Sequence, residues 1–246
     1  MTIEKMKRGI KMTYNKRFDG RGFDELRPIE AKAGVIPRAD GSGYFKIGNT
    51  EAYAAVYGPR NLFPKFMQNP QKGILRCKYN MMPFSGAGDR VRPGTSRRSK
   101  EISWVTEQAL LPALNLEDFP NSVVDVFIEL PQTDAGTRAA GICAASIALA
   151  DAGLTMKGLV SAIACGRVGD KVVVDLTKEE EDYKEEGGVA DIPIAMIPEL
   201  GIVTLLQMDG DLKPEELKEA MEKAKEALTR INDIQKEAIR ERYSLR

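Results

Sequence analysis

The chain has 246 residues, enough for one large domain or two smaller lobes, and 43% of them are apolar, as is ordinary for a globular protein. Its 36 basic and 36 acidic residues balance and it has no histidine, which excludes His-based triads, histidine general bases and most zinc chemistry. Three scattered cysteines, no apolar run of the roughly 20 residues that span a bilayer, and a polar basic N-terminus without a signal-peptide core together predict a reducing, cytoplasmic location and no membrane partner.

The first half of the chain predicts strands around one buried helix. After a basic leader, residues 1–16, the segment GYFKIGNTEAYAAVYGP (43–59) predicts two strands joined at Gly48-Asn49, since both residues tolerate a positive φ. Residues 123–130 alternate as a strand does. Residues 138–152, RAAGICAASIALADA, are small and apolar all round and are followed by Gly153, so they predict a buried helix against a sheet.

The second half repeats the strand-turn-strand pattern. Residues 161–177 place Gly169-Asp170 between two apolar runs, and DIPIAMIP (191–198) and GIVTLLQMDG (201–210) predict two further strands. A long amphipathic helix begins at Pro214, and its apolar stripe faces the core (Leu217, Met221, Ala224, Leu228, Ile231 and Ala238). The order of elements predicts an α/β (α+β) fold of two βαβ-type lobes with mixed sheets, residues 17–152 and 153–246.

The stretch QTDAGTRAAG (132–141) lies between a predicted strand and the buried helix. Free N–H groups and the positive end of the helix dipole favour an anion there. Gly136 allows close approach to the backbone, Thr137 offers a hydroxyl and Arg138 a planar fork that suits phosphate. The alternative is an ordinary N-cap by Thr133, Asp134 or Thr137, with Arg138 in a structural salt bridge.

A second helix, opened by Thr95 or Ser96, carries Arg97 and Arg98 in its first turn. Cations there oppose the helix dipole, and a bound anion would reverse this effect. The two arginines are therefore candidates for binding the phosphates of a polyanion. The alternative is a solvated charge pattern completed by Lys100 and Glu101.

The segment TKEEEDYKEEGGVADIP (177–193) is an acidic loop that leads into an apolar strand at Asp191. A carboxylate fixed beside a phosphate site can hold Mg²⁺ or donate a proton to a leaving oxygen. The alternative reading is a solvated acidic surface.

In this order the motifs resemble the RNase PH family of phosphorolytic 3′-to-5′ exoribonucleases, and most closely its archaeal exosome branch. The likeness extends from RFDGRGFDELRPIEAKAGV (17–35) through MPFS, SRRSKEIS, QTDAGTRAAG and ADIPIAM to the last helix.

The resemblance implies a role for each motif. Gly136, Thr137 and Arg138 would bind the attacking inorganic phosphate, and Arg97 and Arg98 the RNA backbone. Asp191 would be the catalytic carboxylate, with Asp182 as the second acid and as a partner in holding Mg²⁺. Glu185 is a rival for Asp182, because the loop between the two acids is longer than the family pattern. Lys65 would line the RNA entry of a ring.

The resemblance also implies partners: single-stranded RNA, an inactive RNase PH-like paralogue alternating with this chain in a hexameric ring, and RNA-binding cap proteins. The expected activity is reversible phosphorolysis that releases nucleoside diphosphates. Two other functions stay open, a catalytically silent RNA-binding subunit of such a ring and a phosphate-binding metabolic enzyme. A silent subunit would be expected to lack Arg138 or Asp191, and this chain has both.

Overall fold

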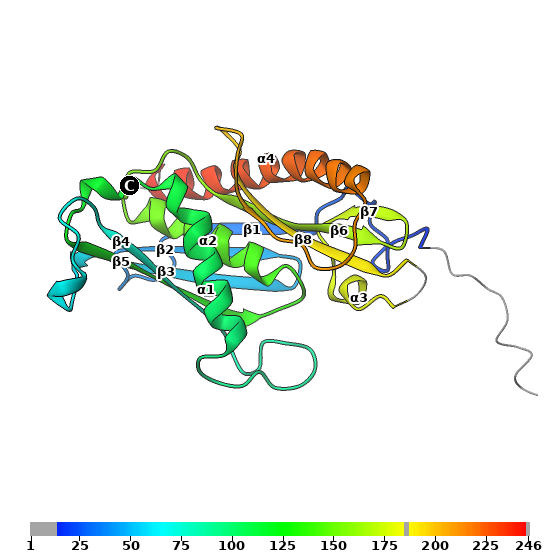
Figure 1. Cartoon of the computed structure of the whole chain (residues 1–246), viewed down its shortest axis with the longest axis horizontal. Helices are drawn as coiled ribbons and strands as arrows, with labels where there is room; N and C mark the ends of the chain where they lie inside the picture. Colours follow the sequence, from blue (N-terminus) through cyan, green and yellow to red (C-terminus); the bar gives the residue numbers. More distant parts are fainter. Residues whose placement is uncertain (1–13, 185–186, 245–246) are drawn as a thin grey trace, which may run out of the picture.

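The computed structural model describes residues 14–184 and 187–244, and within them two β-sheets pack with the helices α1, α2 and α4 (Figure 1). The part of the basic leader at residues 1–13 lies outside the described residues. Each sheet supplies residues to one shared cleft, described below, and α2 lies where the two sheets meet.

The first sheet has the strand order β1-β2-β3-β5-β4. Its first three strands form antiparallel hairpins, and Gly48 adopts a φ of 57° in the predicted turn. β4 and β5 are parallel and are connected through α1, which makes one βαβ unit. The elements are β1 (Ile29–Ala33), β2 (Gly41–Ile47), β3 (Thr50–Asn61), β4 (Ile74–Met81), α1 (Arg97–Leu110) and β5 (Ser122–Gln132).

The second sheet has the order β7-β6-β8-β9 and is antiparallel throughout. It differs in this respect from the expected βαβ lobe, because the Gly169-Asp170 turn joins β6 directly to β7 and so forces an antiparallel pair. A short helix, α3, follows β7. The elements are β6 (Ser161–Val168), β7 (Lys171–Val174), α3 (Lys178–Glu181), β8 (Val189–Ile197) and β9 (Ile202–Leu206).

The predicted buried helix is α2 (Thr137–Asp151), which contacts β2 and β3 of the first sheet and β6 of the second. Its small side chains let it pack very closely. A Cβ added at Gly43 of β2 would lie 2.3 Å from the carbonyl oxygen of Ala144. Cys143 of this helix is a buried free thiol, as are Cys77 and Cys165. The close packing fixes where the N-terminus of α2 lies relative to both sheets.

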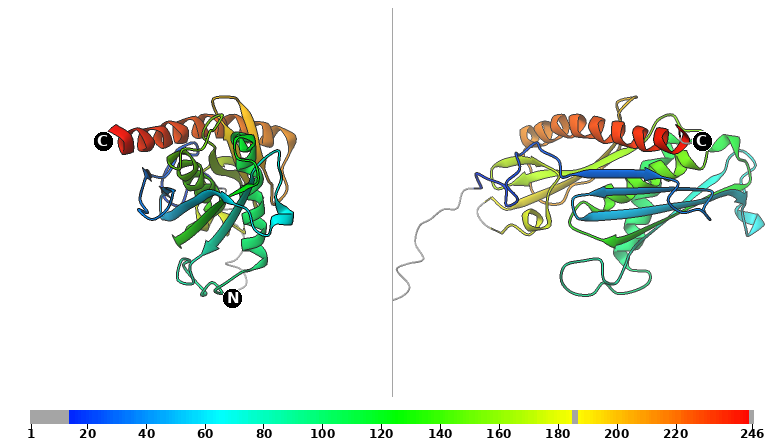
Figure 2. Two further views of the ribbon diagram at one scale, coloured as in Figure 1. Left: turned by 90° about the vertical axis from the view of Figure 1, so that its left-hand side faces the viewer. Right: turned by 180° about the vertical axis from the view of Figure 1, so that it is seen from behind.

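The long C-terminal helix α4 (Pro214–Ser244) runs along the molecule and contacts β1 and β6, one strand from each sheet (Figure 2). Its buried side includes Ala224, Leu228, Ile231 and Ala238 of the predicted stripe. Within residues 14–184 and 187–244, no helix has the length and apolar character that crossing a membrane requires.

Candidate active site

The turn between β5 and α2 presents backbone N–H groups without a competing side chain. Ala135 and Gly136 both adopt left-handed conformations, with φ values of 56° and 61°, and α2 begins at Thr137. The first N–H groups of an α-helix have no intrahelical partner. In the described structure no side chain caps α2. An ordinary side-chain N-cap is therefore absent here, and the helix terminus is open to an anion.

Arg138 follows in the first turn of α2, and its guanidinium stays partly open. One amino group donates a hydrogen bond to Oε1 of Gln207, and the other lies 3.9 Å from Glu101, whose side chain is 53% exposed. A contact of that length to an exposed carboxylate is weak. Gln207 thus orients the guanidinium and leaves its charge available to a ligand.

Asp191 lies in β8, and its backbone exchanges two hydrogen bonds with Asp209 at 2.8 and 2.9 Å. Its Oδ1 atom is buried and has no hydrogen-bond partner in the part of the chain that the structure describes. Burial, reinforced by the negative charge of Glu181, raises the pKa of Asp191 to about 6 although Arg138 opposes the shift. A carboxylate with a raised pKa and a buried oxygen that has no hydrogen-bond partner is typical of a functional site.

A single cleft brings these groups together from both sheets. It is lined by Arg98, Gly136, Thr137, Arg138, Ala139, Ala164, Glu181, Asp191 and Pro193. Arg98, Gly136, Thr137 and Glu181 also line a larger groove of about 820 Å³ that extends past Asn49, Ser85 and Val91. The cleft is small, and the groove leads a longer ligand to it.

The second acid of this cleft is Glu181. Asp182 does not line it: its side chain is 63% exposed and pairs with Lys178 at 3.0 Å. Glu185, the rival candidate, lies outside the described residues. The signal for Glu181 was a capping box, in which Thr177 accepts from the N–H of Glu180 and the Glu180 carboxylate accepts from that of Thr177. This box begins α3 and turns the next acid, Glu181, toward Asp191.

Comparisons with known proteins identify the family. Residues 25–155 match the profile of the 3′ exoribonuclease family, domain 1, and residues 158–227 match domain 2 of the same RNase PH family. The chain belongs to the RNase PH family. The predicted family, fold class and 3′ exoribonuclease class are thereby confirmed.

Several relatives within the RNase PH family are named as exosome components. The chain is 51% identical over 228 residues to the exosome complex component Rrp41 of Thermococcus kodakarensis, covering 93% of this chain and 90% of that protein. It is 49% identical to Rrp41 of Methanopyrus kandleri, over 92% of this chain and 93% of the other.

Solved structures agree on the fold. Rice Rrp46 superposes with a TM-score of 0.76 at 27% identity, covering 91% of this chain and all (100%) of that one. A chain of the Archaeoglobus fulgidus exosome with RNA bound to the active site superposes with a TM-score of 0.75 at 23% identity, covering 89% and 92%.

Of the three residues predicted to contact RNA, only Arg98 lines the cleft. Ser96, rather than Thr95, caps α1, so Arg97 and Arg98 occupy its first two positions. Arg98 lines both the cleft and the groove, whereas Arg97 is exposed and lines neither. Lys65 is exposed at the start of a short 3-10 helix after β3, η2 (Lys65–Met67), and lines neither the cleft nor the groove. The structure thus does not bring Lys65 to the cleft.

The donor set in the cleft fits Mg²⁺. Among the described residues no group of three or more Cys, Asp or Glu side chains is arranged to hold a metal ion. Mg²⁺, however, is commonly bound by one or two carboxylates together with substrate phosphates and water. Asp191 offers an unpartnered oxygen, and Glu181 lines the same cleft.

Proposed function

We propose that this chain shortens single-stranded RNA from its 3′ end by phosphorolysis, as the active subunit of an archaeal exosome ring. One observation carries the proposal: an uncapped helix N-terminus with an arginine lines the same small cleft as Asp191, whose carboxylate has a buried oxygen without a hydrogen-bond partner among the described residues. The helix N-terminus and its arginine can bind an inorganic phosphate. The carboxylate can act on the oxygen that leaves when this phosphate attacks the RNA.

In the proposed reaction, orthophosphate rests on the N–H groups of residues 136–138 and beside Arg138. One of its oxygens attacks the phosphorus of the last phosphodiester. The bond from that phosphorus to the 3′ oxygen of the preceding nucleotide breaks, and this oxygen takes up a proton. The products are a nucleoside diphosphate and an RNA shorter by one residue. Because a phosphodiester is exchanged for a pyrophosphate link, the reaction is reversible and adds nucleotides when diphosphates are abundant.

The chain's own groups would act mainly by position and charge. Arg98, at the junction of the groove and the cleft, holds the scissile phosphate and offsets the charge that develops on it. Backbone contacts of this kind predict little base preference and a strong salt dependence. Arg97 and Lys65 remain proposed RNA contacts outside the cleft.

Asp191 and Glu181 would hold Mg²⁺, which when bound supplies positive charge beside the reacting phosphates. Asp191 can also hold a proton at its buried Oδ1 and pass it to the leaving 3′ oxygen. The pH dependence of turnover separates these two roles. A proton donor is lost as the pH rises through about 6, whereas a metal-holding carboxylate is gained over the same range.

The proposed ring partners are an inactive RNase PH-like paralogue and RNA-binding cap proteins, and the proposed location is the cytoplasm. β9 is an edge strand of its sheet, and large apolar side chains are exposed on it and beside it. Such an edge suits a contact with another subunit. The exposed apolar residues here are Leu200, Ile202, Val203, Leu206 and Met208.

The decisive experiment uses RNA labelled in its last nucleotide, with Mg²⁺, in the presence and absence of orthophosphate. The chain is assayed alone and with the paralogue expected to complete the ring. We expect labelled nucleoside diphosphate only with phosphate, and loss of this product in Arg138→Ala and Asp191→Ala. Lys171→Ala, which removes a basic side chain that lines neither the cleft nor the groove, serves as the control and should leave the product unchanged.

Two other results would overturn the proposal. Nucleoside monophosphate released without orthophosphate would show a hydrolase. RNA binding with no product under either condition would show a silent scaffold subunit.

A further inference from the structure

The phosphate-binding turn is held in a conformation that its own sequence does not favour. Ala135 has a φ of 56°, in the left-handed region that a residue with a Cβ atom rarely adopts. Ala135 itself is buried and contributes no side-chain hydrogen bond. The surrounding structure must therefore impose the conformation.

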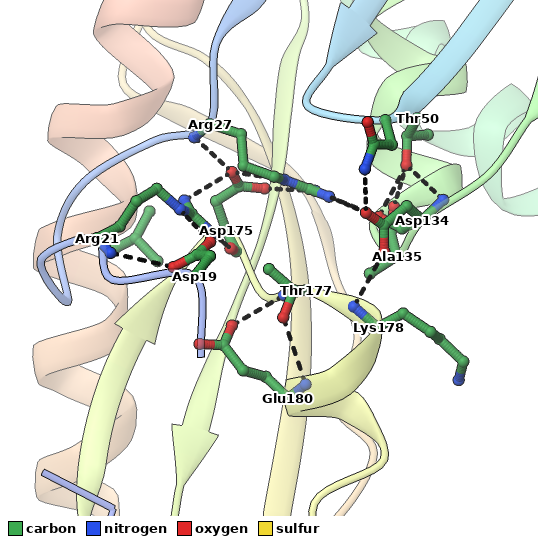
Figure 3. Close-up of polar contacts among 12 residues, drawn as sticks. Asp19, Arg21, Arg27, Thr50, Asp134, Ala135, Asp175, Thr177, Lys178 and Glu180 are labelled. Carbon is green, nitrogen blue, oxygen red and sulfur yellow. Dashed lines mark hydrogen bonds and ion pairs between the residues drawn. The ribbon is translucent and has the colours of Figure 1, made fainter. Parts of the chain in front are cut away.

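The first contact that does so comes from Thr50, at the start of β3. Its buried hydroxyl accepts a hydrogen bond from the N–H of Asp134 at 2.8 Å. The same oxygen lies 2.7 Å from the carbonyl oxygen of Ala135 and 2.9 Å from that of Asp134, to which it can donate. The hydroxyl thus ties the turn to the first sheet, with the carbonyls of Asp134 and Ala135 directed at Thr50 (Figure 3).

The second contact comes from Arg27, just before β1. Its Nη1 donates to the carbonyl oxygen of Asp134 at 2.5 Å. The rest of its guanidinium is fixed by Asp175, with Nε to Oδ2 at 2.9 Å and Nη2 to Oδ1 at 2.7 Å, and the Arg27 N–H donates to Oδ2 at 2.8 Å (Figure 3). The side chains of Arg27 and Asp175 are 6% and 1% exposed. A buried bidentate pair of this kind is rigid.

Asp175 belongs to the second sheet's connection into α3, so the pair spans both halves of the cleft. It follows β7 directly and precedes the Thr177 cap of α3 by two residues. The Asp134 carboxylate makes a parallel link, since its Oδ1 accepts from the N–H of Lys178 at 3.3 Å. The turn that would bind phosphate and the helix that carries Glu181 are therefore joined through the buried Arg27–Asp175 pair and this exposed hydrogen bond.

We propose that Thr50 and the Asp175-fixed Arg27 are positioning residues for the phosphate-binding turn. They hold the carbonyls of residues 134 and 135 so that the N–H groups of residues 136–138 converge on the phosphate. Neither side chain lines the cleft. This inference rests on the proposed function, because it requires phosphate to bind at that turn.

The test compares Thr50→Val with Thr50→Ser, and adds Arg27→Lys, in the full chain and in the assembly in which it is active. Thr50→Val removes the hydroxyl and keeps the branched shape, whereas Thr50→Ser keeps the hydroxyl. With saturating RNA, we expect Thr50→Val and Arg27→Lys to raise the KM for inorganic phosphate by about tenfold or more, since small misplacements are costly in a site of this kind. Thr50→Ser should have the wild-type KM for phosphate. The KM for RNA should be unchanged in all three variants.

Arg76→Lys is the matched control, because Arg76 and Asp125 form another bidentate pair, between β4 and β5. Its phosphate KM should equal that of wild type. If Thr50 and Arg27 only stabilise the fold, their variants will contain less folded protein, which lowers kcat and leaves the KM for phosphate unchanged. That result would overturn the inference. If Arg138→Ala also leaves the phosphate KM unchanged, the turn is not the phosphate site and the proposed function fails. If Arg138→Ala raises it and Thr50→Val does not, the positioning inference alone fails.

Discussion

At the scale of single residues, two neighbouring acids have different environments. Both contact Lys178, at 3.5 and 3.0 Å, but the Glu181 side chain is 25% exposed and lines the cleft with Asp191, whereas that of Asp182 is 63% exposed and does not line it. We predict that Glu181→Gln lowers kcat by about 100-fold or more, because it removes a charge from the reacting centre. Asp182→Asn, the matched control, should leave kcat unchanged. Single-turnover phosphorolysis measures both, and equal losses in the two variants would contradict the placement.

Asp191 is expected to lower the stability of the fold in return for its function. Its pKa of about 6 lies above the ordinary 3.8, so the folded state favours the protonated form. The protonated carboxyl stabilises the folded state relative to the ionised one. This contribution is fully present below pH 3.8 and is lost as the pH rises through about 6. We therefore predict that Asp191→Asn is more stable than wild type by about 2 kcal/mol at pH 8.

Urea unfolding at pH 8, 6 and 4 tests this prediction. The difference between Asp191→Asn and wild type should shrink as the pH falls from 6 to 4, because the wild-type carboxyl then becomes neutral as well. A variant that is less stable than wild type at pH 8 would show that Asp191 has a favourable partner.

At the scale of elements, α1 begins with two cations at the positive end of its dipole. Arg97 is exposed and lies outside the cleft. Arg97→Glu should therefore stabilise the protein by about 0.5 kcal/mol. The same variant should weaken RNA binding. Losing one contact to single-stranded RNA lowers the steepness of the plot of log affinity against log salt by roughly 0.7, and Arg97→Glu should lower it by more because it also adds a negative charge. Thermal unfolding and RNA titration at several salt concentrations measure the two effects, and Arg97→Gln should fall between the variant and wild type.

The elements that the sequence predicted well are those whose signals are local. The Gly48-Asn49 and Gly169-Asp170 turns need a positive φ, and the small apolar composition of α2 allows only a buried helix. These features placed Arg138 and Asp191 correctly on a helix start and a strand. The sequence did not indicate that Glu181, rather than Asp182, lines the cleft with Asp191, because the position of Glu181 depends on the capping box at the start of α3.

The contacts behind the cleft were beyond sequence reasoning for a different reason. Arg27, Thr50 and Asp175 are far apart in the chain, and each has an unremarkable local pattern. Only the packing of α2 against both sheets brings them to one turn. Lys65 lines neither the cleft nor the groove, and its predicted place at the RNA entry of a ring stays a prediction.

At the scale of the whole molecule, the segment before the first sheet is bound to the second sheet through one buried acid. Glu180 is fully buried, accepts from Arg17 at 2.8 and 2.7 Å, and accepts from the Tyr14 hydroxyl. Although burial alone would raise its pKa, the hydrogen bonds from Arg17 and Tyr14 hold the pKa of Glu180 below its ordinary value. Glu180 is also the N3 residue of the α3 capping box, so it links the packing of Tyr14 and Arg17 to the position of Glu181.

We predict that Glu180→Gln lowers the free energy of unfolding by about 3 kcal/mol at pH 7, because it leaves the buried Arg17 charge without its partner. A lowered pKa stabilises the fold above pH 4.5 and this contribution is lost as the pH falls through the folded value, so the gap to wild type should close under acid. Glu30→Gln, which breaks an exposed pair with Lys32, should leave the unfolding midpoint unchanged. If the difference in unfolding free energy between Glu180→Gln and wild type stays the same below pH 3, Glu180 acts through packing and neutral hydrogen bonds. The charge of its pair with Arg17 would then contribute nothing to holding α3 in place.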